Sequence, residues 1–170
     1  AWLFTAITGG GGDTDDAHVS VTPLGAGGSV AAGDLDGDSF ADLVVGDPVA
    51  GEVYLLSGAA GGGTVDPTTG GVLPLVATLQ IPGMGGDVAV VENHDGTGAA
   101  TVVVGGADSG AAWMFMAPFT GTMVEELAAA EVATSGERVA VADIGDADGD
   151  GKGDLLVGDP LAGGGDGRVL

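Results

Sequence analysis

The sequence contains no cysteine, so neither disulfide bonds nor thiolate metal sites can stabilise it. Only three of its 170 residues are lysine or arginine, and nucleic acid is not expected as a partner because phosphates need cationic side chains. Aromatic residues make up 4% of the chain, so the core must consist largely of alanine, valine and leucine. No apolar run approaches the roughly 18 residues of a membrane span, so no membrane-spanning segment is expected.

No serine or threonine has a recognisable set of catalytic partners, and we expect the chain not to be an enzyme. Acidic residues are abundant instead: 25 aspartates and glutamates give a net charge of −22. Such a surface favours solubility and suits either a calcium-rich or a salty environment. Salt adaptation and calcium binding both remain open as explanations of the acidity.

Two acidic nonapeptides dominate the sequence, DLDGDSFAD at residues 34–42 and DADGDGKGD at residues 146–154. Each has aspartates at positions 1, 3, 5 and 9 and leads into an apolar segment, DLVVGDP or DLLVGDP. Four carboxylates within nine residues repel one another unless a cation lies among them. Alternating oxygen ligands suit calcium far better than zinc. The two nonapeptides therefore predict two calcium sites.

The nonapeptides allow two other interpretations. An EF-hand loop needs a glutamate at position 12, where this chain has Val45 and Val157, so that interpretation fails. An ion-free turn is the simpler alternative, because aspartate and glycine both favour turns. The repetition of the same aspartate spacing before an apolar strand favours calcium.

A third, weaker copy of the nonapeptide lies between the two acidic ones. Asn93, Asp95, Thr97 and Thr101 occupy the four positions that aspartates hold elsewhere, and TVVVGGA follows. A single carboxylate offers a poor calcium site. We expect weak binding or none there.

The spacing of the three copies divides the chain into a partial strand at 1–16 and repeats at 17–76, 77–129 and 130–170. Each repeat offers about four short Val- and Leu-rich strands, which is the size of one propeller blade. The composition of residues 127–132 favours a helix, but their alignment with the preceding repeat favours a strand. Trp2, Tyr54 and Trp113 occupy equivalent positions and are expected to pack between blades, with carbohydrate stacking as the alternative.

The ends of the sequence fall inside predicted strands. Residues 1–6 align with residues 112–117 of the third strand of a blade, and Leu170 falls in the same strand of a later blade. Incomplete strands expose edges that pair with other strands. We therefore expect contacts at both termini with further blades, further copies or a protein partner.

Together these features resemble the FG-GAP repeat of the integrin alpha-subunit β-propeller, most clearly over residues 28–58 (GSVAAGDLDGDSFADLVVGDPVAGEVYLLSG) and 136–170. The resemblance implies an all-β fold of four-stranded antiparallel blades whose acidic loops bind calcium, with a backbone carbonyl as the ligand at position 7. The ligands it implies are Asp34, Asp36, Asp38, Phe40 (carbonyl) and Asp42 in one loop, and Asp146, Asp148, Asp150, Lys152 (carbonyl) and Asp154 in the other.

The resemblance also implies a location and a role. We expect a calcium-stabilised propeller segment that is extracellular or at the cell surface and has a structural or adhesive role. One alternative is a non-catalytic accessory domain of a larger secreted enzyme. Another is a subunit of a polymeric surface assembly.

Overall fold

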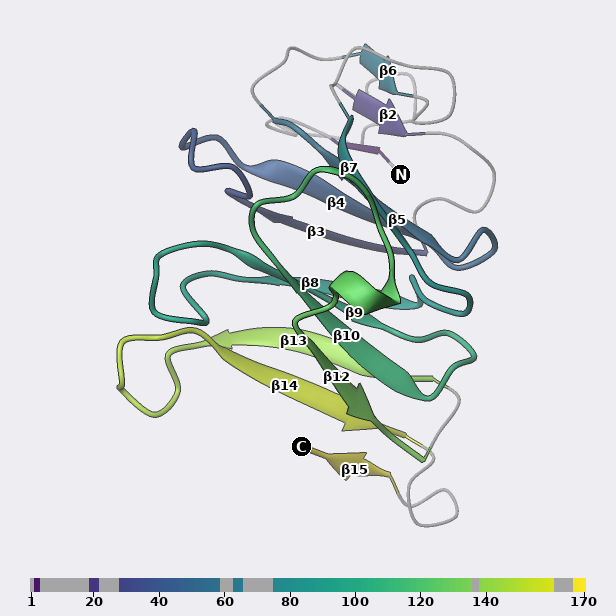
Figure 1. Ribbon diagram of the computed structural model, residues 1–170, viewed down its shortest axis with the longest axis vertical. Coiled ribbons are helices and arrows are strands. Elements are labelled where there is room, and N and C mark those ends of the chain that lie inside the picture. Colours follow the sequence, from purple (N-terminus) through teal and green to yellow (C-terminus); the bar gives the residue numbers. More distant parts are fainter. Residues whose placement is uncertain are drawn as a thin grey trace, which may run out of the picture.

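The computed structural model describes residues 2–3, 19–21, 28–58, 63–65, 75–135, 138–160 and 167–170, and their regular secondary structure is almost entirely β-strand (Figure 1). The strands are β1 (Trp2–Leu3), β2 (Val19–Val21), β3 (Ser29–Gly33), β4 (Asp42–Asp47), β5 (Glu52–Leu56), β6 (Gly63–Val65), β7 (Leu75–Gln80), β8 (Asp87–Val91), β9 (Thr101–Gly105), β10 (Ala111–Met116), β11 (Gly121–Met123), β12 (Ala130–Ala133), β13 (Ala140–Gly145), β14 (Asp154–Asp159) and β15 (Arg168–Val169). No helix among these residues is long and apolar enough to cross a membrane.

Two complete antiparallel sheets form the centre of the molecule. One has the order β3-β4-β5-β7 and the other β8-β9-β10-β12. In each, the strands follow one another in the sequence, except that one short strand (β6 or β11) precedes the last. A third sheet, β13-β14-β15, follows the same pattern. The predicted all-β fold of repeated four-stranded antiparallel units is confirmed. The described sheets are stacked and do not close into a ring (Figure 1).

The sheets and the sequence repeats are offset by one strand. A repeat boundary at residue 77 falls within β7, which pairs with β5 and completes the first sheet. In the same way β12 follows the third strand of its own sheet and pairs with β10. Each blade therefore takes its fourth strand from the stretch that opens the next sequence repeat.

The strand that the alignment of residues 127–132 favours forms from Ala130 onward, and only Leu127 of this segment is helical. A short 3-10 helix, η2, spans Glu125–Leu127, and β12 begins at Ala130. Ala128 is already extended, and the amide of Ala129 donates to the carbonyl of Met114 on β10. Pairing with β10 thus outweighs the helix propensity of the alanines.

The core lies between the stacked sheets. One cluster joins side chains of β4, β5 and β7 to those of β8, β9 and β10, and a second joins the opposite faces of β8, β9 and β10 to β13 and β14. Along β9, Val102 and Val104 face the first cluster and Val103 faces the second. This alternation explains why Val102, Val103 and Val104 are all apolar, because both faces of β9 are covered.

Two three-residue strands, which the sequence did not predict, join neighbouring sheets. β11 lies between β10 and β12 in the sequence but pairs in parallel with β7 of the preceding sheet. β6 lies between β5 and β7 and pairs in parallel with β2. The outer sides of β7 and β2 are therefore each covered by a parallel strand.

Candidate metal-binding loops

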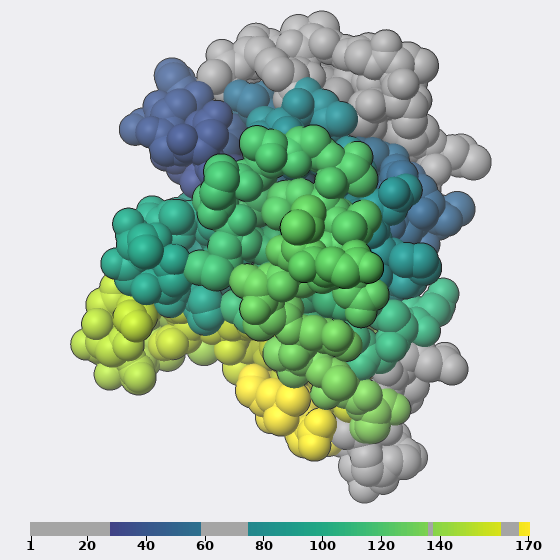
Figure 2. All heavy atoms as spheres, in the orientation of Figure 1, coloured from purple at the N-terminus to yellow at the C-terminus, as the bar shows by residue number. Residues whose placement is uncertain are grey.

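The three related loops connect the first two strands of each sheet, β3 to β4, β8 to β9 and β13 to β14. Because the sheets are stacked in the same orientation, all three loops project from one side of the molecule (Figures 1 and 2). They are seen along the left edge of both views, in dark blue, teal and yellow-green. We refer to them as the first loop (residues 34–42), the middle loop (93–101) and the third loop (146–154).

Aspartate side chains fold the first loop by accepting hydrogen bonds from its backbone. Asp34 accepts from the amides of Gly37 and Ser39, with N–O distances of 2.7 and 2.9 Å. Asp36 accepts from the amide of Asp38 at 3.1 Å, and Asp38 in turn accepts from Phe40 at 2.8 Å. Such bonds hold the chain in successive tight turns.

The third loop repeats this arrangement. Asp146 accepts from Gly149 and Gly151 at 2.8 and 2.9 Å, and Asp148 accepts from Asp150 at 3.0 Å. The fourth residue of each loop has a left-handed backbone, with φ of +82° at both Gly37 and Gly149. Glycine adopts that conformation without a steric penalty, which explains its presence at this position.

Three carboxylates converge in each acidic loop. Oxygens of Asp34, Asp36 and Asp42 all lie within 4.8 Å of one another, as do oxygens of Asp146, Asp148 and Asp154. Calcium binds oxygen at about 2.3 to 2.6 Å, so oxygens on opposite sides of one ion are about 5 Å apart. The donor type and the separation therefore both fit calcium.

Two further predicted carboxylate ligands, Asp38 and Asp150, are not members of these groups. Asp38 and Asp150 point into the next turn, where they accept from the amides of Phe40 and Lys152 at 2.8 Å in both loops. The Phe40 side chain is 60% exposed. Lys152 leans toward the middle loop, since a methyl group added at Gly96 would stand 3.2 Å from its Cε atom.

The last carboxylate differs between the two acidic loops. Asp42 is fully buried and accepts from the amides of Leu35 and Gly58, both at 2.8 Å. Burial raises the pKa of Asp42, and the two amides oppose this shift only in part. Asp154 is half-buried and accepts from Ala147 at 2.8 Å and from Asp148 at 3.3 Å.

The middle loop keeps part of the hydrogen-bond pattern of the acidic loops and only one of their carboxylates, Asp95. Asn93 accepts from the amide of Gly98 at 2.7 Å, and Asp95 accepts from the amide and hydroxyl of Thr97 at 2.8 and 2.6 Å. The hydrogen bonds from Thr97 lower the pKa of Asp95. Thr101, at the position of Asp42, is buried, and its hydroxyl has no hydrogen-bond partner among the described residues.

The middle loop also contacts both of its neighbours. The Asn93 side-chain amide donates to the carbonyl of Gly151 at 2.7 Å, and His94 Nδ1 lies 2.8 Å from the carbonyl oxygen of Gly153. On the other side Glu92, which directly precedes the middle loop, accepts from the amide of Asp34 at 3.2 Å. The three loops thus form one connected surface.

Two buried aspartates that sequence reasoning did not single out help to hold the sheets. Asp47 accepts from the amides of Val49 and Ala50 and so shapes the turn after β4. Asp159, the equivalent residue of the third sheet, accepts from both the amide and the hydroxyl of Ser135 at 2.8 Å. Their repeated Gly-Asp-Pro setting is the signal that could have identified them.

Comparison with known families agrees with this geometry. Residues 26–66, which include the first loop and the strands on both sides of it, match the family model described as FG-GAP repeat. This stretch of the chain is similar to an FG-GAP repeat. FG-GAP repeats fit a β-propeller, and the stacked antiparallel sheets are consistent with blades of that kind. A search of the curated proteins finds no significant match.

Proposed function

We propose that this FG-GAP repeat protein is a calcium-stabilised propeller segment with a structural or adhesive role outside the cell. The observation that carries the proposal is the pair of matching carboxylate groups, Asp34, Asp36 and Asp42 in the first loop and Asp146, Asp148 and Asp154 in the third. Both groups occur at the same place in their sheets, between the first and second strands.

The three carboxylates of each group come from the two ends of one loop. In the first loop Asp34 and Asp36 follow β3, and Asp42 begins β4. Bound calcium would supply the positive charge that these converging oxygens lack. Asp34 and Asp36 would then be held against Asp42, which is anchored to Leu35 and Gly58, so that the loop fixes the angle between the two strands.

Location and role rest on the FG-GAP repeat. Such repeats are typically extracellular and serve in protein interaction. Extracellular calcium modules commonly have dissociation constants of roughly 0.1 to 1 mM, which open loops of this kind could reach. We propose a binding role for this chain rather than catalysis. An accessory domain of a larger secreted enzyme and a subunit of a surface assembly would use the same loops in the same way.

Thermal unfolding in three buffers tests the proposal: excess chelator, millimolar calcium, and high sodium chloride without calcium. Calcium at a hundredfold above its dissociation constant stabilises the fold by about 2.7 kcal/mol per site. For a domain of this size, that corresponds to a rise in Tm of about 5 to 10 °C per site. Equal stabilisation by sodium chloride would show that charge screening suffices, and would contradict specific sites.

Single variants locate the effect. Asp36→Ala and Asp148→Ala should each remove part of the calcium-dependent rise in Tm and change little in chelator. Asp108→Ala is the matched control, because it removes an exposed carboxylate that belongs to neither group. The proposal fails if Asp36→Ala and Asp108→Ala respond to calcium alike.

A further inference from the structure

Glu92 lies where the three loops meet. It directly precedes the middle loop, and the corresponding residues before the first and third loops are Gly33 and Gly145. Only the middle copy thus has a side chain at this position. The contacts of Glu92 with both neighbouring loops show what that side chain does.

The pairing of the first two strands ends one residue earlier in the middle sheet than in its neighbours. The last pairs are Gly33 with Asp42 in the first sheet, Gly145 with Asp154 in the third, and Val91 with Thr101 in the middle one. Glu92 therefore lies beyond the end of β8, and Asn93 after it has a left-handed backbone with φ of +54°. Because Glu92 is not held by strand pairing, its side chain can turn toward a neighbouring sheet.

The Glu92 carboxylate reaches the first loop. Its Oε1 atom accepts a hydrogen bond from the amide of Asp34 at 3.2 Å. Gly33 leaves room for this contact, because a Cβ atom there would stand 2.9 Å from Oε1 and 2.5 Å from Cγ1 of Val90. Gly33 does not have a positive φ, so the space taken by the middle sheet explains this glycine.

The backbone of Glu92 packs against the third loop on the other side. A Cβ atom at Gly153 would stand 2.3 Å from the carbonyl oxygen of Glu92, which is too close for any side chain. The carbonyl of the same glycine lies 2.8 Å from His94 Nδ1. The third loop therefore supports the backbone from which the Glu92 carboxylate extends to the first loop.

A carboxylate at this place suits a first loop that holds a cation. The nine residues 34–42 already include four aspartates, and a fifth negative charge beside them is repelled when no cation is present. Glu92 bonds to the amide of Asp34, whose own carboxylate belongs to the convergent group. With a divalent cation in the loop, the charge of Glu92 becomes attractive.

We propose that Glu92 is a positioning residue for the first calcium site and acts on Asp34 from the neighbouring sheet. This inference rests on the proposed calcium function and adds to it a residue outside the acidic nonapeptide. The hydrogen bond to the Asp34 amide orients the backbone that carries the first carboxylate of the site, and the charge of Glu92 adds to the attraction for the ion. Calcium in the first loop thereby also strengthens the contact between the first and middle sheets.

Calorimetric titration of calcium into the Asp148→Ala variant tests the proposal, because that variant keeps the first site. Adding Glu92→Gln retains an acceptor for the Asp34 amide but removes the charge, and calcium affinity should fall about three- to fivefold at low ionic strength. Glu92→Ala removes charge and acceptor and should lower it about tenfold. In the Asp36→Ala background, which keeps the third site, Glu92→Gln should leave calcium affinity nearly unchanged.

Thermal unfolding in chelator separates positioning from ordinary support of the fold. Without calcium, Glu92→Gln relieves repulsion among carboxylates, so Tm should stay the same or rise slightly even though calcium binds more weakly. A residue that only supported the fold would lower Tm equally in chelator and in calcium. Equal losses of that kind in Glu92→Gln would overturn the proposal.

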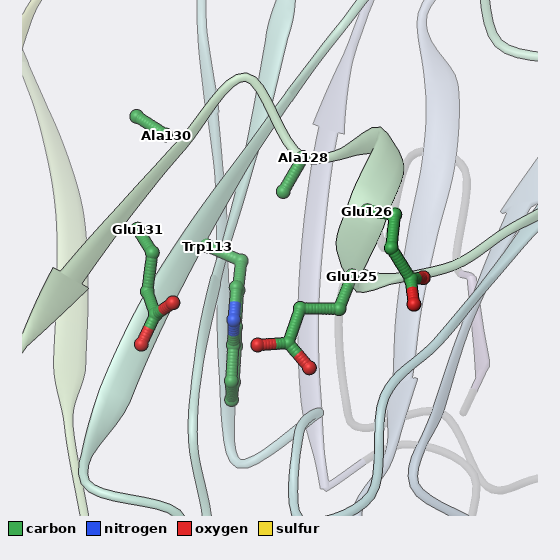
Figure 3. A pocket seen from close by; sticks show the side chains of 6 residues that line it. All are labelled: Trp113, Glu125, Glu126, Ala128, Ala130 and Glu131. Atoms are coloured by element: carbon green, nitrogen blue, oxygen red, sulfur yellow. The ribbon is translucent and has the colours of Figure 1, made fainter.

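Glu131 provides the matched control. It is also an exposed glutamate of the middle sheet, but it lies on β12, at the opposite edge of that sheet from β8. Figure 3 shows the carboxylates of Glu131 and Glu125 on opposite sides of the Trp113 ring, where all three residues line one hollow. Glu131→Gln removes the same charge as Glu92→Gln and should leave the calcium affinity of the first site unchanged.

The outcomes distinguish this inference from the function on which it rests. If the unaltered protein does not bind calcium, the proposed function and this inference are both wrong. If the first site binds calcium equally well with and without Glu92→Gln, this inference alone is wrong. An equal loss of affinity in Glu131→Gln would show that net charge accounts for the effect, and would overturn the positioning role as well.

Discussion

The first and middle loops share part of their backbone geometry but differ at the first residue, where Asn93 is left-handed with φ of +54°, and in their side chains. In both, the first residue accepts from the amide of the sixth, as Asp34 does from Ser39 and Asn93 from Gly98. In both, the fourth residue is a left-handed glycine, with φ of +82° at Gly37 and +79° at Gly96. An asparagine can therefore accept the same hydrogen bond from the sixth residue as an aspartate does. The turn accounts for the oxygen and glycine positions but not for the repeated negative charge, which the proposed calcium sites would explain.

The middle loop is held in place by contacts with the two loops on either side of it. Its Asn93 and His94 bond to carbonyl oxygens of the third loop, and Glu92 bonds to the first. A loop that lies between two others can be held by both. The first and third loops each have only one such neighbour in the described structure, so an ion would contribute more to their stability.

The largest expected effect comes from giving the first loop the side chains of the middle one. The triple variant Asp34→Asn, Asp38→Thr and Asp42→Thr should lose one site's share of the calcium-dependent stabilisation, about 2.7 kcal/mol at a hundredfold excess. Thermal unfolding with and without calcium measures this. The fold should survive in chelator, because the middle loop shows that the turn forms with these residues. A calcium response equal to that of the unaltered protein would refute the role of the carboxylates.

A smaller effect is expected from removing the last carboxylate of each acidic loop, Asp42 or Asp154, when calcium is absent. The two variants should lose different amounts of folding stability. Asp42→Ala leaves the amides of Leu35 and Gly58 without their acceptor in a buried place and should cost about 1 to 3 kcal/mol in chelator. Asp154→Ala should cost less than about 1 kcal/mol, since water can reach that loop. Chemical denaturation in chelator compares the two variants. Equal losses would mean that burial of Asp42 does not distinguish the loops.

The contact between the middle and third loops should contribute still less to the stability of the fold. His94→Ala removes the interaction with the Gly153 carbonyl and should cost about 0.5 to 1.5 kcal/mol. Because the third loop would lose a support, its calcium affinity should fall while that of the first loop stays unchanged. Calorimetric titration of His94→Ala in the Asp36→Ala and Asp148→Ala backgrounds separates the two sites. A loss confined to the first loop would contradict the observed contact.

The smallest effect concerns pH. Burial raises the pKa of Asp42 above its usual 3.8 in the folded protein, so the folded state binds this proton more readily than the unfolded state does. In chelator, the contribution of Asp42 should therefore stabilise the fold as the pH falls through that raised pKa. In calcium the sign should reverse, because the proton competes with the ion.

The matched control for this pH effect is Asp42→Asn, which cannot titrate at that position. In chelator it should show a smaller gain in Tm on acidification than the unaltered protein, since only the general relief of negative charge remains. Identical pH profiles would show that Asp42 does not contribute.

Much of this structure was predictable because its signals are local. Aspartate, glycine and asparagine at fixed spacing dictate the loop turns through hydrogen bonds spanning a few residues. The apolar runs after each loop predicted β4, β9 and β14. In β9, whose two faces are both covered, the run is buried throughout, whereas in β14 Leu156 is exposed. The convergence of Asp34, Asp36 and Asp42 followed from the same spacing.

Other features depend on residues far apart in the sequence. Nothing local to β7 shows that it completes the sheet of β5, and three residues such as Gly121–Met123 carry too little pattern to predict a strand.

The sequence by itself therefore determined the repeated loop-and-strand unit and the type of ion that suits it, because both depend on neighbouring residues. Tertiary structure alone decided that Asp42 is buried while Asp154 is half-exposed, and that Glu131 stands beside Trp113 at an open sheet edge. These outcomes depend on which strands and sheets come to lie side by side. That arrangement is set by the burial of apolar faces and by strand pairing across distances that no short motif records.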